Sequence, residues 1–237
     1  MLTGIFSDKT RFIKLLETMS AGIWPTCRIF LLTLAIAVPL GMLLAAGRVS
    51  KFKPLNWLVS LYVYIMRSTP LMLQLLFSYF LLSQLKWNPT LTFFFGDKRS
   101  AMPNSCIIYM FSLNYAAYFA EIFRGGIQAI SVGQKEAAKV LGYRPIQAFF
   151  RIQVPQIFKT VMPSLTNEFV TLVKDTSIAK VISTSIEDRT VLEIASKQAT
   201  SLATIEPYIL VFVFFLLFNG IVEQGCKFIE RRLNYYR

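Results

Sequence analysis

Apolar segments that are long enough to cross a membrane alternate with short charged segments along this sequence. The clearest is residues 29–47, an apolar run of 19 residues between Arg28 and Arg48. A helix of this length suits a hydrocarbon core of about 30 Å, whereas the apolar core of a signal peptide has only about 7 to 15 residues. The pattern therefore predicts a first membrane-spanning helix over residues 24–47 and argues against a signal peptide.

Four further apolar segments follow the first. The second, residues 55–85, is interrupted by the polar sequence from Arg67 to Pro70. Two crossings with a turn at Pro70 would leave only 12 residues before Arg67, or about 18 Å of helix, so we predict one tilted or kinked crossing. The remaining predicted spans are residues 105–123, 161–183 and 207–226. We therefore expect an all-α polytopic membrane protein with five transmembrane helices in a single transmembrane domain, residues 1–237.

Two segments outside these spans have a character of their own. Residues 1–23 mix charged and apolar side chains, which is typical of an interfacial helix before a first span. Residues 124–160 form a basic loop between spans three and four. In this loop, good helix formers over residues 134–141 are stopped by Gly142, and Pro145 suits the first turn of a second helix over residues 144–152. We expect a helix, a glycine break and a helix; the alternative is an ordinary amphipathic loop on the membrane surface.

Composition supports a membrane protein and sets its orientation. The chain is 54% hydrophobic and 14% aromatic, which is too apolar for one soluble domain. Its net charge of +12 does not indicate nucleic acid, because the basic residues flank apolar segments; membrane lipid is the expected partner. With residues 124–160 in the cytoplasm, the cytoplasmic segments hold 13 Lys and Arg residues against 8 outside. The N-terminus is then outside and the C-terminus is cytoplasmic.

Four short motifs point to a family. Glu136-Ala137-Ala138 followed by Gly142 resembles the EAA loop of permease subunits of ABC importers, and Gly133-Gln134 before it resembles the polar amino acid branch. A Glu-Ala-Ala tripeptide alone would be weak, because it is common in any helix. Three other motifs of that branch occur in family order, and the resemblance covers about residues 20–230. They are Arg67-Ser68-Thr69-Pro70, the run from Ala120 to Gly126, and Lys174-Asp175-Thr176-Ser177.

The resemblance implies a type I importer fold and a set of partners. These are a cytoplasmic ABC ATPase dimer, a second permease subunit that is identical or a sister chain, an extracytoplasmic solute-binding protein and an amino acid substrate. ATP would be bound by the ATPase, so we expect no cofactor on this chain. The expected location is the inner or cytoplasmic membrane, with several passes. The residues implied to lie in the coupling helix that docks on the ATPase are Glu136, Ala137, Ala138 and Gly142.

Polar side chains at predicted membrane depth mark a candidate pathway, since charged groups there normally face a cavity or a partner. On the third span Asn114, Tyr118 and Glu121 share one helical face. On the fourth, Glu168, Thr171 and Asp175 share another, and we predict that the two faces meet around a wet cavity. The full candidate set is Arg67, Asn114, Tyr118, Glu121, Glu168, Thr171, Lys174, Asp175 and Ser177.

A structural role is the alternative for several of these residues. Glu121 and Asp175 could be neutralised inside the helix bundle by basic residues, and Asn114 and Tyr118 could serve packing alone. The basic residues considered as partners are Arg67, Arg124 and Lys174.

Catalysis and metal binding have no support in the sequence. The chain has no histidine, and its three cysteines form no CxxC pattern, which excludes a zinc or haem–histidine site and disfavours a disulfide framework. No GxxxxGK[ST] loop or nucleophile elbow occurs, so we expect a transport subunit without its own ATPase site. The rival hypothesis is a self-sufficient ion- or proton-coupled carrier or channel that uses Glu121 and Asp175. Five spans without a repeat count against it.

Overall fold

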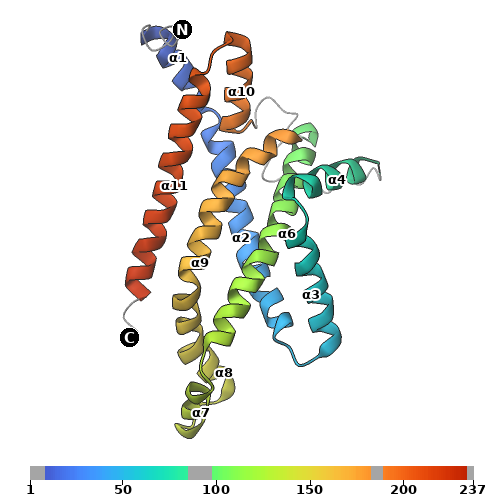
Figure 1. Cartoon of the computed structure of the whole chain (residues 1–237), viewed down its shortest axis with the longest axis vertical. Coiled ribbons are helices and arrows are strands. Elements are labelled where there is room, and N and C mark those ends of the chain that lie inside the picture. The colour runs from blue at the N-terminus through green and yellow to red at the C-terminus, as the bar shows by residue number, and fades with distance from the viewer. Residues whose placement is uncertain (1–8, 85–97, 183–188, 234–237) are drawn as a thin grey trace. The chain divides into compact units, whose positions relative to one another are not determined.

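The computed structural model describes residues 9–84, 98–182 and 189–233, and over these ranges the secondary structure is helical with no strand (Figure 1). This confirms the all-α fold class. A π-helical turn, Phe149–Gln153, precedes α9, and a 3-10 turn, Thr176–Val181, follows it. The α-helices are α1 (Lys9–Ser20), α2 (Ile23–Arg48), α3 (Lys53–Ser68), α4 (Leu71–Gln84), α6 (Lys98–Ala129), α7 (Val132–Val140), α8 (Pro145–Ala148), α9 (Val154–Asp175), α10 (Val191–Leu202) and α11 (Glu206–Leu233).

Internal contacts divide the chain into two compact units, each built from three segments. The first unit holds residues 1–36, 69–113 and 171–219. The second unit holds residues 37–68, 114–170 and 220–237. The sequence predicts one transmembrane domain, and no pattern in it indicates these two units. Four helices, α2, α6, α9 and α11, contribute residues to both.

Length and composition identify several candidate spans among the described residues. Lys9–Arg48, Pro103–Ala129 and Glu206–Leu233 are each long and apolar enough to cross a membrane. Helices α3 and α4 meet these requirements only together, as a broken span or a re-entrant segment. Helix α9, the expected fourth span, has 22 residues but is not among these candidate spans. Charged and uncharged polar residues lie along it, including Gln156, Lys159, Asn167 and Glu168.

The break between α3 and α4 has a local cause. Pro70 has no backbone N–H and cannot extend α3, which ends at Ser68. Its carbonyl instead begins α4 by accepting hydrogen bonds from the N–H groups of Leu73 and Gln74, at 3.0 and 3.1 Å. The Gln74 side chain also donates to the hydroxyl of Thr69, at 2.5 Å. The predicted interruption is therefore present, but as two separate helices of 16 and 14 residues.

The predicted helix, glycine break and helix is confirmed. Helix α7 ends before Gly142, whose φ of 77° is in the left-handed region that favours glycine. Helix α8 begins at Pro145, and the side chain of Gln147 accepts from the N–H of Arg144 at 3.2 Å. The chain then stays helical through the π-turn from α8 into α9, which the sequence pattern did not indicate. Residues 124–129 and 154–160, which were assigned to the loop, thus belong to the long helices α6 and α9.

In the second unit α6 and α9 pack closely together. The rings of Phe119 and Phe169 lie 5.8 Å apart, and those of Phe123 and Phe158 lie 6.0 Å apart. A Cβ atom on Gly126 would lie only 2.4 Å from a methyl carbon of Val161. A glycine at this position therefore lets the two helices approach.

In the first unit α1 packs on protein through its apolar face. Leu15 and Met19 are buried against Val191 and Ala195 of α10 and Val211 of α11. The amphipathic pattern of residues 1–23 is thus explained over α1 by contacts within the unit. Whether this segment also lies at a membrane interface stays a prediction.

Candidate functional site

An ion cluster in the second unit joins α2 and α6. The carboxylate of Glu121 lies 2.7 Å from the guanidinium of Arg48, at the end of α2, and 2.7 Å from that of Arg124, one turn along α6. Arg48 also donates a hydrogen bond to the hydroxyl of Ser60, and the Asn56 side chain donates to the backbone carbonyl of Arg48. Since Ser60 and Asn56 belong to α3, these contacts connect α2, α3 and α6.

The other two polar residues of the predicted third-span face contact the end of α3. The guanidinium of Arg67 lies 5.2 Å from the ring centroid of Tyr118, which is a cation–π contact. The side chain of Asn114 donates to the backbone carbonyl of Met66 at 2.9 Å. That carbonyl cannot receive the usual helical bond four residues on, because Pro70 lacks an N–H. The Asn114 side chain therefore donates the hydrogen bond to the Met66 carbonyl that a backbone N–H at position 70 would otherwise donate.

A polar cavity of about 520 Å³ lies beside the ion cluster. It brings together two of the predicted pathway residues, Arg67 and Glu121, while Tyr118 stacks on Arg67 from α6. Next to it, Val59 and Val63 of α3 pack against Ala117 and Ala120 of α6. The small alanine side chains allow the close approach of α3 to α6. The residues that line the cavity are Arg48, Ser60, Val63, Tyr64, Arg67, Ser68 and Glu121.

The remaining pathway candidates lie at the end of α9. Glu168 belongs to the second unit, whereas Thr171, Lys174, Asp175 and Ser177 belong to the first. Asp175 is the last residue of α9, and Ser177 lies in the 3-10 turn that follows. Glu168, Thr171 and Asp175 each take part in an interaction within the chain, and Lys174 is exposed. The meeting of the α6 and α9 faces around one wet cavity stays a prediction.

The segment from Val132 to Gln153, which holds α7, α8 and the π-turn and contains the predicted coupling residues, exposes apolar side chains that sequence reasoning missed. Of the motif residues, Glu136 and Ala137 are exposed and Ala138 is buried. The apolar residues around them have exposed fractions between 64 and 87%. Where such side chains form a contiguous patch, the patch commonly marks an interaction site. The available signal was a set of apolar positions within an otherwise basic segment, namely Val140, Leu141, Ile146 and Phe150.

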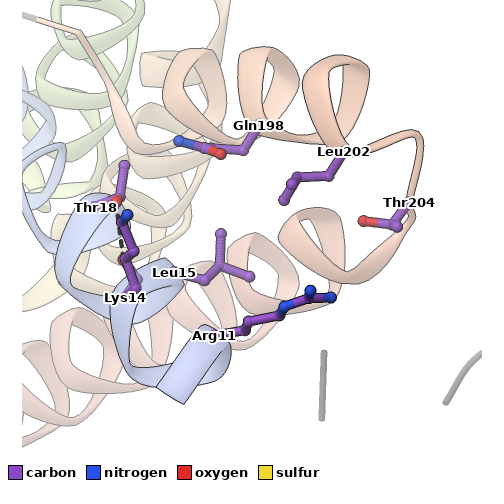
Figure 2. A pocket seen from close by; sticks show the side chains of 7 residues that line it. All are labelled: Arg11, Lys14, Leu15, Thr18, Gln198, Leu202 and Thr204. Atoms are coloured by element: carbon purple, nitrogen blue, oxygen red, sulfur yellow. Dashed lines mark hydrogen bonds between the residues drawn. The ribbon is translucent and has the colours of Figure 1, made fainter. Parts of the chain in front are cut away.

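A second pocket, of about 550 Å³, lies in the first unit. Figure 2 shows side chains of α1 on one side of it and side chains of α10 and the following loop on the other. Arg11 and Lys14 make its α1 side basic, and Leu15 and Leu202 provide apolar contacts. The buried hydroxyl of Thr204 has no hydrogen-bond partner within the described ranges. None of the functional residues predicted from the sequence lines this pocket.

Known proteins resemble this chain over almost its whole length. The family described as the binding-protein-dependent transport system inner membrane component matches residues 37–235. The chain belongs to this family. Its members are permease subunits of ABC transporters, which have no ATPase of their own, and the transport system implies an ATPase and a binding protein as partners. Membership also disfavours the rival hypothesis of a self-sufficient carrier.

Individual relatives agree with this assignment. The chain is 34% identical over 218 residues to the L-cystine transport system permease protein TcyB of Bacillus subtilis, covering 92% of this chain and 87% of that protein. It is 38% identical over 161 residues to the arginine transport system permease protein ArtQ of the same organism, covering 68% of each. A crystal structure of an amino acid ABC transporter with histidines matches with a TM-score of 0.80 and 28% identity, over 98% of this chain and 100% of that one.

The ion cluster predicts a measurable coupling between Arg48 and Glu121. Because their side chains are only 22 and 17% exposed, a double-mutant cycle of Arg48→Gln and Glu121→Gln should give a coupling of about 2 kcal/mol in unfolding free energy. The matched control is the pair Lys227 and Glu223 on α11, at 2.6 Å and about half exposed. Its cycle should give at most about 1 kcal/mol. Equal coupling in both cycles would contradict a stabilising role for the cluster.

Proposed function

We propose that the chain is the permease subunit of an ABC importer that moves a polar amino acid into the cytoplasm, powered by a separate ATPase subunit. Family membership supports the permease role. The amino acid substrate is supported by the relatives, whose names give L-cystine and arginine transport, and by the matching amino acid transporter structure. The motifs of the polar amino acid branch agree with it.

The observation that carries the proposal is the exposed apolar surface of the coupling segment. Leu141 and Ile146, on the two sides of Gly142, are both 73% exposed. Contact of such apolar side chains with water is unfavourable, so their burial against a partner would stabilise the complex. A groove on the ATPase would cover them, and Glu136 beside them would add a polar contact. Because the helix continues from Pro145 through the π-turn to Asp175, a displacement of this segment would reach the polar end of α9. Rocking of the spans between inward and outward openings would follow.

The complete assembly would contain several partners. We assign to it an ATPase dimer in the cytoplasm, a second permease subunit that is identical or a sister chain, an extracytoplasmic solute-binding protein and membrane lipid. ATP would bind to the ATPase, and this chain would carry no cofactor. The pathway would use the candidate residues on α3, α6 and α9, which are Arg67, Asn114, Tyr118, Glu121, Glu168, Thr171, Lys174, Asp175 and Ser177.

Five spans remain our proposed topology. Helices α2, α6 and α11 would supply three of them and the broken pair α3 and α4 would supply one. Helix α9 would be the fifth. The charged residues of α9 suit a span that faces a cavity or a partner instead of lipid. The proposed spans are residues 24–47, 55–85, 105–123, 161–183 and 207–226, with residues 124–160 and the C-terminus in the cytoplasm and the N-terminus outside.

Reconstitution in vesicles tests the function directly. The permease assembled with its ATPase and binding protein should take up a radiolabelled amino acid only when ATP is supplied. The permease alone should be inert, since it has no ATPase of its own. Uptake by the permease alone, driven by a proton or sodium gradient, would refute the proposal in favour of a carrier.

The positive φ of Gly142 predicts that substitutions at Gly142 and at Gly133 affect coupling differently. Gly142→Leu should uncouple substrate-stimulated ATP hydrolysis from uptake, because a left-handed residue with a side chain costs roughly 1 to 2 kcal/mol and would distort the docking surface. Gly133→Leu is the matched control, since Gly133 also has open space for a side chain but has no positive φ. Membrane insertion, ATPase activity and uptake are measured for each. Wild-type coupling in Gly142→Leu would count against the proposed docking.

The proposed orientation predicts the labelling of single cysteines. In a background without Cys27, Cys106 and Cys226, a cysteine at Lys51 should be protected from an impermeant thiol reagent added outside intact cells. A cysteine at Lys197 should react. Both lysines are exposed, so protection reports the membrane side and not burial. Labelling of the cysteine at Lys51 from outside would rule out this topology.

A further inference from the structure

The two arginines of the polar cavity are in different electrostatic situations. Arg48 is neutralised by Glu121 at 2.7 Å. Arg67 is exposed, and its guanidinium stacks on Tyr118 at 5.2 Å. Among the residues that the structure describes, no carboxylate forms a salt bridge with Arg67. The cavity therefore holds a cation without an acidic partner.

The rest of the lining adds to this excess of positive charge. The one carboxylate among the lining residues, Glu121, is already shared between Arg48 and Arg124, each at 2.7 Å. Tyr64 and Ser68 also line the cavity, and a hydroxyl group can donate a hydrogen bond. A ligand that fits these groups accepts hydrogen bonds and carries negative charge.

The position of Arg67 makes an unpaired charge costly. It lies 14 residues beyond Lys53 in α3, which is about 21 Å along the helix axis, and immediately before the break in the proposed second span. An arginine at this depth needs a counter-charge or a wet cavity. The negative end of the α3 dipole and the Tyr118 ring orient the guanidinium, but each is worth only about 1 kcal/mol and leaves its donors available.

We propose that the guanidinium of Arg67 binds the α-carboxylate of the transported amino acid in this cavity. A guanidinium presents two parallel N–H donors that match a carboxylate, and stacking on Tyr118 holds its plane. Glu121 is already held by Arg48 and Arg124 and does not receive the substrate's ammonium group in this proposal. This inference rests on the proposed function, because it assumes that an amino acid passes through this subunit.

The proposal has a consequence for specificity. All α-amino acids carry the group that Arg67 would bind, so this contact selects for a free carboxylate and not for one side chain. It would discriminate strongly against an α-carboxamide, since a neutral amide leaves the arginine uncompensated.

The first test uses a reporter cysteine at Ser68, in a background without native cysteines. In the purified permease and ATPase complex without binding protein, an anionic thiosulfonate reagent should label this cysteine faster than a cationic one. L-Arginine and L-glutamine should slow the labelling, whereas their α-carboxamides should need a concentration about tenfold or more higher. This comparison keeps Arg67 in place, so it does not depend on whether an Arg67 variant folds.

The second test changes the arginine itself. Arg67→Gln should abolish the preference for the acid over the amide and for the anionic reagent, and Arg67→Lys should restore part of both. Lys51→Gln is the matched control, since it removes one exposed positive charge outside the cavity and should change neither preference. A purely structural role of Arg67 would lower the yield of complex without changing these ratios.

The outcomes separate this inference from the proposed function. Equal protection by acids and amides, faster labelling by the cationic reagent, or an unchanged acid preference in Arg67→Gln would overturn the inference. ATP-driven uptake of an amino acid with any of these results would leave the function standing. Absence of both ATP-driven uptake and protection by any amino acid in the wild-type complex would overturn both.

Discussion

The second unit depends on holding Glu121 between two arginines. A lone carboxylate in an apolar helix bundle is expensive, and a pair that loses one partner leaves an uncompensated charge. Arg124 lies on the same helix, but Arg48 comes from the end of α2 and also hydrogen-bonds to α3. The requirement to neutralise one residue therefore fixes the positions of three helices. Because Arg48 and Arg124 already neutralise Glu121, no carboxylate among the residues that line the cavity pairs with Arg67.

A proline sets a second constraint on the same helices. Pro70 ends α3 and deprives the Met66 carbonyl of its usual donor, and Asn114 of α6 supplies another at 2.9 Å. The break and the polar residue on the neighbouring helix thus belong together. In this interpretation Asn114 stabilises the end of α3, while Arg67, one residue beyond Met66, lines the cavity. The same turn of helix serves both packing and proposed substrate binding.

Local features of the structure were predictable from the sequence, and contacts between distant segments were not. The break at Gly142 follows from its neighbours in the chain, and so does the pairing of Glu121 with Arg124 at i and i+3. The pairing with Arg48 was missed, because one sequence does not indicate which charges meet after folding. The division into two units and the exposed apolar surface around Leu141 were missed for the same reason. Whether the α6 and α9 faces meet depends on contacts of this distant kind.

The π-turn between α8 and α9 makes the length of the coupling segment as important as its composition. A π-turn contains about one residue more than an α-turn, and each residue of an α-helix advances the side-chain direction by about 100°. Loss of one residue from Phe149–Gln153 would therefore rotate α8 by more than a quarter of a turn about the axis of α9. Ile146, which is 73% exposed, would then point to a different side. Single-residue deletions here should be selected against even where substitutions are tolerated. The number of residues in the turn determines the rotation of α8 about the axis of α9, and a substitution leaves that number unchanged.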